Sequence, residues 1–143
     1  MAVKKIILVG EELCIRKEGI AGGTVTPGHL VQGPATAIIV HGTAAGTAQK
    51  AFCYEREMTG DGIDVDYAAS DTILYAVCPP GTVIWALADA TGITAEDFVE
   101  SNGDGTFQVV ATSAATADTS RNSVVGKALT TAAANARFQL EVY

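Results

Sequence analysis

The chain has 143 residues, of which 48 % are hydrophobic and only 17 % are charged. This size and composition fit a single folded domain, residues 1–143, and they exclude an intrinsically disordered chain. The formal net charge of −7, with nine Lys and Arg residues spread along the chain, argues against direct binding to nucleic acid or to an anionic membrane.

The N-terminal segment "AVKKIILVG" places two lysines before four apolar residues. This apolar run is too short for a signal peptide or a membrane span, so we expect a protein that is made and kept in a cytosol. Residues 1–17 are expected to form the first strands of the fold or an N-terminal arm, and residues 1–9 could add a strand to a neighbour's sheet. In the arm interpretation the contact residues are Val3, Lys4, Lys5, Ile6 and Ile7.

Most of the remaining chain is predicted to form short strands, which are rich in β-branched and aromatic residues and are separated by turn signals. The predicted strands are residues 4–9, 12–19, 36–42, 50–57, 72–78, 82–88, 105–112, 123–129 and 136–143. Pro27-Gly28 favours a type II turn, and Pro79-Pro80 predicts an exposed corner because two prolines remove two ladder donors. This pattern is typical of a compact all-β barrel or sandwich.

The stretch "TGDGIDVDYAASDTI", residues 59–73, contains four aspartates. A calcium loop of the EF-hand type needs ligand side chains at alternate positions and a glycine at the sixth, and the spacing from Asp61 fails both conditions. A period of two fits better, with Asp64 and Asp66 facing solvent. We therefore expect a half-buried strand whose apolar face is formed by Ile63, Val65 and Tyr67.

One segment departs from the strand pattern. Thr94 can cap a short helix of about two turns, with acidic residues in its first turn and a stop at Asn102-Gly103. Residues 102–105, "NGDG", then form a hairpin-type turn that leads into Phe107. Residues 111–123 are expected to form a long surface loop.

The cysteines carry no metal-binding or redox motif, because none belongs to a C-x-x-C pair. The three cysteines, Cys14, Cys53 and Cys78, cannot all pair within one chain. Cys53 and Cys78 lie in apolar surroundings and are expected to be buried free thiols.

The other reactive side chains also lack a catalytic pattern. His29 or His41 could act as a general base, but each is expected to be structural or on the surface. Trp85 is expected in the core, and Glu55 and Glu57 flank Arg56 as on a charged strand edge. We therefore predict no catalytic residue, no cofactor site and no metal site, and a protein that is not an enzyme.

The order of several motifs resembles the head decoration, or cement, proteins of tailed bacteriophages. The resemblance covers most of the chain from Glu18 onward. The matching positions are Pro27 and Gly28; Gly60, Ile63, Tyr67, Asp71 and Ile73; Pro80 and Gly81; Gly103 to Gly105; and Val125, Gly126, Ala128 and Leu129.

The resemblance implies an all-β domain with one short helix, built as a compact barrel or sandwich of the β-tulip type. It also implies a homotrimer on the outer surface of the virion, made in the host bacterial cytoplasm. The partner would be the major capsid protein, and the trimer would bridge capsomers of the expanded head against the pressure of packaged DNA. The low charge fraction also favours assembly with partners.

Two other classes of function stay open. The chain could be another self-assembling virion protein, such as a tail-tube or fibre-base component. It could also be a small-ligand-binding barrel or an enzyme whose cavity is lined by Trp85 and the two histidines.

Overall fold

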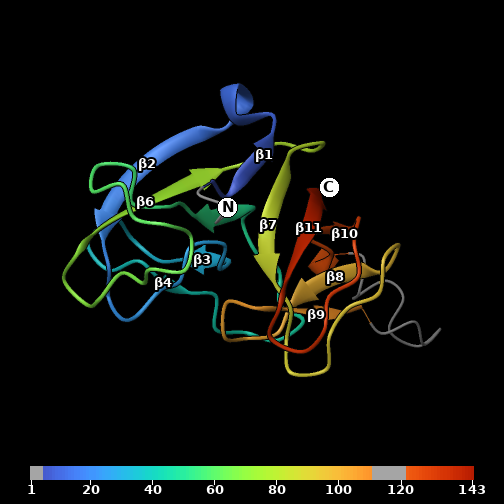
Figure 1. Ribbon diagram of the computed structural model, residues 1–143. Coiled ribbons are helices and arrows are strands. Elements are labelled where there is room, and N and C mark those ends of the chain that lie inside the picture. The colour runs from blue at the N-terminus through green and yellow to red at the C-terminus, as the bar shows by residue number, and fades with distance from the viewer. Residues whose placement is uncertain (1–4, 111–121) are drawn as a thin grey trace.

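A computed structural model describes residues 5–110 and 122–143 (Figure 1). The regular secondary structure of the described residues is almost entirely β, which confirms the predicted fold class. Its one 3-10 helix is η1 (Glu11–Leu13). The strands are β1 (Ile7–Val9), β2 (Ile15–Ile20), β3 (Val31–Gln32), β4 (Ile39–Val40), β5 (Ala51–Cys53), β6 (Thr72–Val77), β7 (Val83–Leu87), β8 (Phe98–Ser101), β9 (Phe107–Val109), β10 (Gly126–Ala128) and β11 (Arg137–Val142).

The largest sheet has six strands in the order β1-β7-β11-β10-β8-β9. The last strand in this order, β9, also meets the chain next to β7. Ala88, directly after β7, forms a parallel bridge with Phe107 at the start of β9. The Asp89 N–H also donates to the Phe107 carbonyl oxygen at 2.9 Å. The sheet therefore closes into a small barrel, and β1 covers the first half of the same edge of β7.

Strict alternation along β11 builds the interior of this barrel. Phe138, Leu140 and Val142 are buried, whereas the residues between them are partly exposed. The ring of Phe107 meets the ring of Phe138 edge-on, with centroids 6.1 Å apart. Apolar side chains at every second position thus point to the axis, as the period of a half-buried strand requires.

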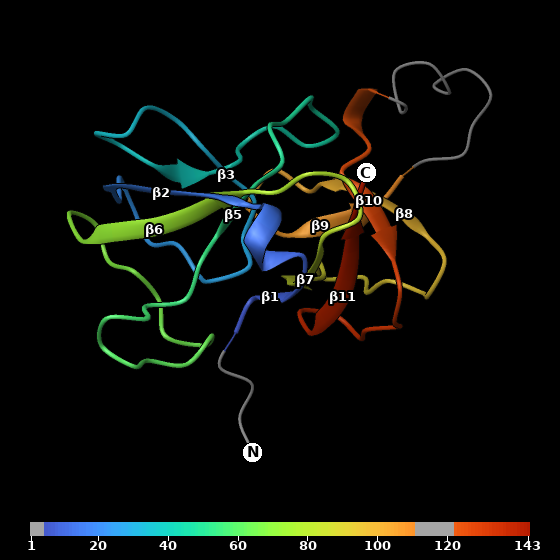
Figure 2. The ribbon, with the colours of Figure 1, turned by 90° about the horizontal axis from the view of Figure 1, so that it is seen from above.

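A second lobe lies beside the barrel (Figure 2). It contains the three-stranded sheet β2-β6-β5 and the two-stranded sheet β3-β4. Its own core includes Val25, Tyr67 and Ile73. The core of the barrel extends toward it through Phe52 in β5, whose ring lies 6.3 Å from that of Phe107.

The turns predicted at Pro27-Gly28 and at Pro79-Pro80 are confirmed. His29 N–H donates to the Thr26 carbonyl oxygen at 3.0 Å, and Gly28 has φ +94°, as a type II turn requires at its third position. A Cβ at Gly28 would also clash with the carbonyl oxygen of Trp85. Pro79-Pro80 forms the corner between β6 and β7, and the Thr82 N–H closes that corner on the Pro79 carbonyl oxygen at 3.3 Å.

The predicted helix after Thr94 is wrong. Thr94 and Asp97 form a turn, in which the Asp97 carboxylate accepts the Thr94 N–H at 3.1 Å, and β8 begins at the next residue. Glu96 has φ +79°, which no right-handed helix allows, and its N–H donates to the Ala128 carbonyl oxygen at 2.8 Å. Pairing with the strand at β10 thus replaces the local helix. The predicted loop at 111–123 lies almost wholly outside the described residues.

The predicted strand within residues 59–73 is also wrong. This stretch is a loop fixed at two points, because Ile63 and Tyr67 are buried whereas Val65 is 41 % exposed. Before β6 begins at Thr72, the only residue of this stretch in a β-bridge is Tyr67, which forms an isolated antiparallel bridge with Val25. Two of its aspartates form ion pairs with arginines. The Asp64 carboxylate accepts a hydrogen bond from Arg137 Nε at 3.2 Å, and Asp71 pairs with Arg56.

Candidate functional surface

The N-terminal strand is tied into the chain's own fold. Ile6 and Ile7 are buried, and β1 pairs with β7. The Ile6 N–H donates to the buried Glu55 carboxylate at 2.9 Å, and the Ile6 carbonyl oxygen accepts the Trp85 N–H at 2.8 Å. Glu55 is therefore an internal anchor, and the prediction that it lies on a charged strand edge is wrong.

The five predicted contact residues are not brought together on one surface. Val3 and Lys4 lie outside the described residues. Lys5 is exposed, with its Nζ 3.3 Å from the Glu11 carboxylate. Ile6 and Ile7 point into the core, so their side chains are not available to a partner without opening the barrel.

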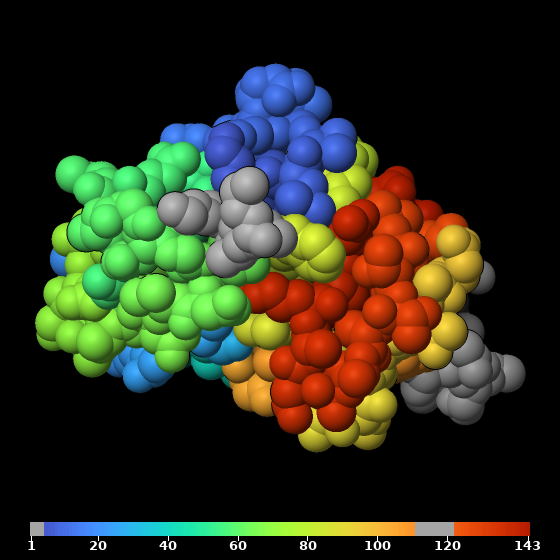
Figure 3. Space-filling model, viewed as in Figure 1, coloured from blue at the N-terminus to red at the C-terminus, as the bar shows by residue number. Residues whose placement is uncertain are grey.

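Large apolar side chains are instead exposed at the end of this strand and in the segment that follows it. We call Leu8, Val9, Leu13 and Ile15 the apolar tip. The last three are 58 %, 64 % and 62 % exposed, although they are large and hydrophobic. They lie on the segment from β1 through η1 to the start of β2, which projects from the body of the molecule at the top of Figure 3. Several large apolar side chains exposed along one short projecting segment are typical of an interaction surface.

A charged network holds the base of the apolar tip. The Glu11 carboxylate accepts the Tyr54 hydroxyl, the Arg16 guanidinium and Lys5. The hydrogen bond from Tyr54 is the largest cause that lowers the pKa of Glu11, so this carboxylate is ionised at neutral pH. Arg16 also pairs with Glu57 at 3.0 Å and lies over the Tyr54 ring, 4.8 Å from its centroid. These contacts fix η1 relative to the second lobe.

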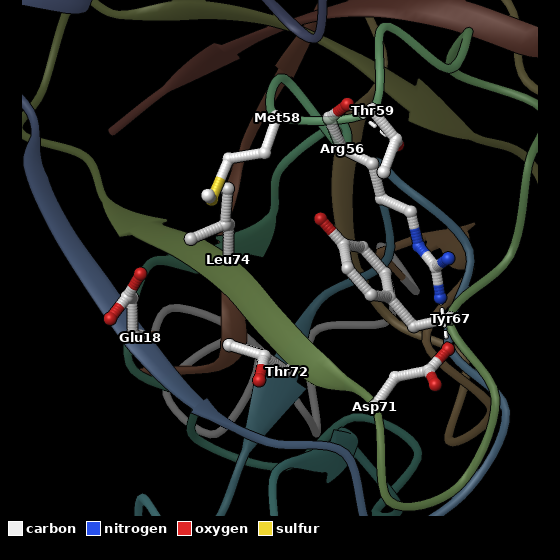
Figure 4. A pocket seen from close by; sticks show the side chains of 8 residues that line it. All are labelled: Glu18, Arg56, Met58, Thr59, Tyr67, Asp71, Thr72 and Leu74. Carbon is white, nitrogen blue, oxygen red and sulfur yellow. Dashed lines mark hydrogen bonds and ion pairs between the residues drawn. The ribbon is translucent and has the colours of Figure 1, made fainter.

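A pocket of about 460 Å³ lies on the second lobe (Figure 4). Its lining residues are Glu18, Arg56, Met58, Thr59, Tyr67, Asp71, Thr72 and Leu74. Arg56 lies over the Tyr67 ring at 4.6 Å and pairs with Asp71. The Asp71 carboxylate also accepts the Ala68 N–H at 2.8 Å, which together with Arg56 lowers its pKa. Arg56 and Asp71 thus neutralise each other, and Glu18 adds one further acidic side chain to a lining whose chemistry is that of a polar surface hollow.

The histidines and Trp85 lie elsewhere. His41 is buried, with Nδ1 2.7 Å from the Ser101 hydroxyl and Nε2 3.3 Å from the Thr47 carbonyl oxygen. This Ser–His contact has the geometry of a nucleophile and its base, but Ser101 is fully buried and no substrate can reach it. His29 accepts the Thr26 N–H on Nδ1 at 3.2 Å, and burial lowers its pKa. Trp85 is half-buried in β7 and packs against the core.

Two further features complete the chemical description. Among residues 5–110 and 122–143, no three His, Cys, Asp or Glu side chains gather as metal ligands would. In the same ranges, no helix has the length and apolar character needed to cross a lipid bilayer.

The sequence assigned Glu55 a wrong role and did not single out Ser101. Their partners, Ile6 and His41, are 49 and 60 residues away. Contacts between residues so far apart in the chain produce no recognisable motif in the sequence.

Comparison with known proteins adds a similarity of fold to a solved structure. No protein-family model and no curated protein sequence matches the chain. The fold is similar to the crystal structure of the N base of head fiber gp8.5 from bacteriophage phi29, with a TM-score of 0.59. The alignment covers 91 % of this chain and 94 % of that chain at 16 % sequence identity. At this identity the likeness is one of fold.

Proposed function

We propose that the chain is a structural protein of a tailed bacteriophage virion that attaches to the outer surface of the head and stabilises the shell as a decoration protein. The observation that carries the proposal is the similarity of fold to a head fiber base over almost the whole length of both chains. The order of turn and strand motifs shared with decoration proteins supports the same location independently.

The proposal assigns no catalysis to the chain. The Ser101–His41 contact is closed to solvent, and the pocket on the second lobe is lined by an internally paired Arg56 and Asp71. A net charge of −7 also makes direct contact with packaged DNA unfavourable.

The attachment surface that we propose is the apolar tip together with Lys5, and its partner is the major capsid protein. The tip is exposed, is held by the Glu11 network and directly follows the predicted contact segment. In the six-stranded sheet β1 is a terminal strand, and no described strand pairs with its outer edge. A strand of the partner could add to this edge, where backbone hydrogen bonds would supplement apolar burial.

The test is co-sedimentation of the purified protein with expanded heads that lack it. We expect the wild-type protein to bind, and the double variant Leu13→Ser/Ile15→Ser to lose at least about tenfold in affinity, because two large apolar contacts are removed. The matched control is Met58→Ser, since Met58 is 88 % exposed on the second lobe and should not affect binding. Equal binding of the tip variant would reject this surface, and no binding by the wild type would reject the head attachment.

The fibre-base alternative has one specific observation in its favour, namely that the structural neighbour is itself a fiber base. Both functions place the chain on the head. They differ in whether the bound protein strengthens the shell.

A further inference from the structure

Cys14 and Cys78 lie opposite each other at the end of a strand pair. In the β2-β6 ladder Ile15 faces Val77 and Arg16 faces Ala76, so the same register places Cys14 against Cys78 one position further on. Opposite residues of an antiparallel pair have Cα atoms about 4.5–5.5 Å apart. Disulfides span Cα distances of about 4.4–6.8 Å, so the backbone here suits a cross-link.

The two sulfur atoms are already in contact. Cys14 Sγ lies 3.2 Å from Cys78 Sγ, although the residues are 64 positions apart in the chain. The Gly10 carbonyl oxygen, 3.4 Å from Cys14 Sγ, and the Thr82 hydroxyl, 3.9 Å from it, complete the surroundings of the Cys14 thiol. A bond requires the sulfurs to approach to about 2.0 Å, which a small side-chain rotation provides.

We propose that Cys14 and Cys78 form a reversible intramolecular disulfide when the protein meets a small-molecule disulfide such as oxidised glutathione. In the first step the Cys14 thiolate attacks a sulfur of the oxidant, which forms a mixed disulfide and releases one glutathione thiolate. In the second step the Cys78 thiolate attacks the Cys14 sulfur and displaces the second glutathione thiolate. Two protein thiols are oxidised, and one oxidised glutathione is reduced to two thiols.

The exposure of the three cysteines sets the order of these steps. Cys14 is partly exposed, whereas Cys78 and Cys53 are buried. Burial, followed by the contact with Cys14, raises the pKa of the Cys78 thiol. The second step should therefore be slow at neutral pH and faster in alkaline buffer. Cys53 belongs to the core of the second lobe rather than to that of the barrel, so it is not a competitor.

The cross-link would tie the base of the apolar tip to the end of β6 and the proline corner. By constraining the unfolded chain over this long loop, it should raise the melting temperature by on the order of 10 °C. The chemistry does not depend on the proposed function, but a virion protein would meet it on leaving the reducing cytosol at host lysis.

The test uses the full chain, incubated with oxidised glutathione at about pH 8.5, then denatured, alkylated and digested with trypsin. The three cysteines fall in different tryptic peptides, residues 6–16, 51–56 and 57–121, so each possible pairing gives a different product. We expect a link between the first and third peptides, an intact mass lower by about 2 Da than that of the reduced chain, and a higher melting temperature that dithiothreitol reverses.

Two variants sharpen this test. Cys53→Ala should retain the link and the shift in melting temperature, and Cys14→Ser should abolish both. Three alkylated cysteines after oxidation, a persistent glutathione adduct on Cys14, a link to Cys53, or a Cys14–Cys14 dimer would each overturn the proposal. The peptide map of the wild-type protein decides the outcome even if a variant folds poorly.

Discussion

At the scale of single residues, Glu55 anchors the N-terminal strand but makes the free energy of unfolding depend on pH. Its carboxylate satisfies the Ile6 N–H in a buried position, but burial raises its pKa above the ordinary value of 4.5. Between 4.5 and the raised pKa, the folded chain retains a proton that the unfolded chain has released. The free energy of unfolding must therefore fall as the pH rises through this window.

Glu55→Gln should remove this dependence. The amide keeps a carbonyl oxygen for the Ile6 N–H but cannot ionise. Across the window above pH 4.5, the free energy of unfolding of the variant relative to the wild type should increase with pH, as measured by urea unfolding in a pH series. Glu12→Gln, at an exposed position, controls for the loss of one negative charge. Parallel curves for Glu55→Gln and the wild type would show that the Glu55 carboxyl does not contribute to this slope.

Arg137 shows why some residue-scale contacts could not be predicted. Its guanidinium donates to the Pro27 carbonyl oxygen at 2.9 Å and to the Ile63 carbonyl oxygen at 2.6 Å, so one side chain joins β11 to a turn 110 residues away. The sequence shows only a basic residue at the start of a strand. Because the planar fork of Arg matches two carbonyl groups that separate segments supply, the role of Arg137 emerges only when the chain has folded.

At the scale of elements, the sequence predicted those strands whose alternation matches their burial. In β7 and β11 every second residue is buried, so the period of two in the sequence is the period of the structure. The segments after Thr94 and around Ile63 carry equally plausible local patterns, yet both were assigned wrongly. In each case a long-range backbone contact, Glu96 with Ala128 or Tyr67 with Val25, outweighs local propensity.

The loop between β4 and β5 allows a test of backbone strain. Ala45 has φ +55°, in the left-handed region, and its N–H donates to the Ser101 carbonyl oxygen at 2.9 Å. Ala45→Gly should stabilise the fold by about 0.5–1 kcal/mol, because glycine adopts this conformation without a Cβ penalty. Ala44→Gly is the matched control. Ala44 is not among the positive-φ residues, so the substitution should destabilise by a similar amount.

Thermal and urea unfolding of both variants measure this difference. Opposite signs for the two substitutions are expected, since the unfolded chains gain the same freedom in each case. Equal destabilisation by both would mean that the loop does not hold Ala45 in the left-handed conformation.

At the scale of the whole molecule, the two lobes have different roles in the proposed assembly. The barrel carries β1 and the buried Tyr54 at the base of the apolar tip, while the second lobe contributes Arg16 of β2 to the network that braces it. A tip held from both sides loses little conformational freedom on binding, which favours affinity. A trimer would multiply this effect, because three linked tips on a symmetric shell raise avidity without new contacts.

This arrangement leads to a prediction that separates the two head-surface functions. Heads assembled without the chain should release their DNA at a lower temperature than complete heads if the protein bridges capsomers, and adding the purified protein should restore the difference. We expect the free protein to have about three times the chain mass of 14.7 kDa by light scattering. The Leu13→Ser/Ile15→Ser variant should keep this mass and fail to restore the heads. Identical DNA release with and without the bound protein would favour a fibre base, since such a component would bind the shell without strengthening it against the pressure of packaged DNA.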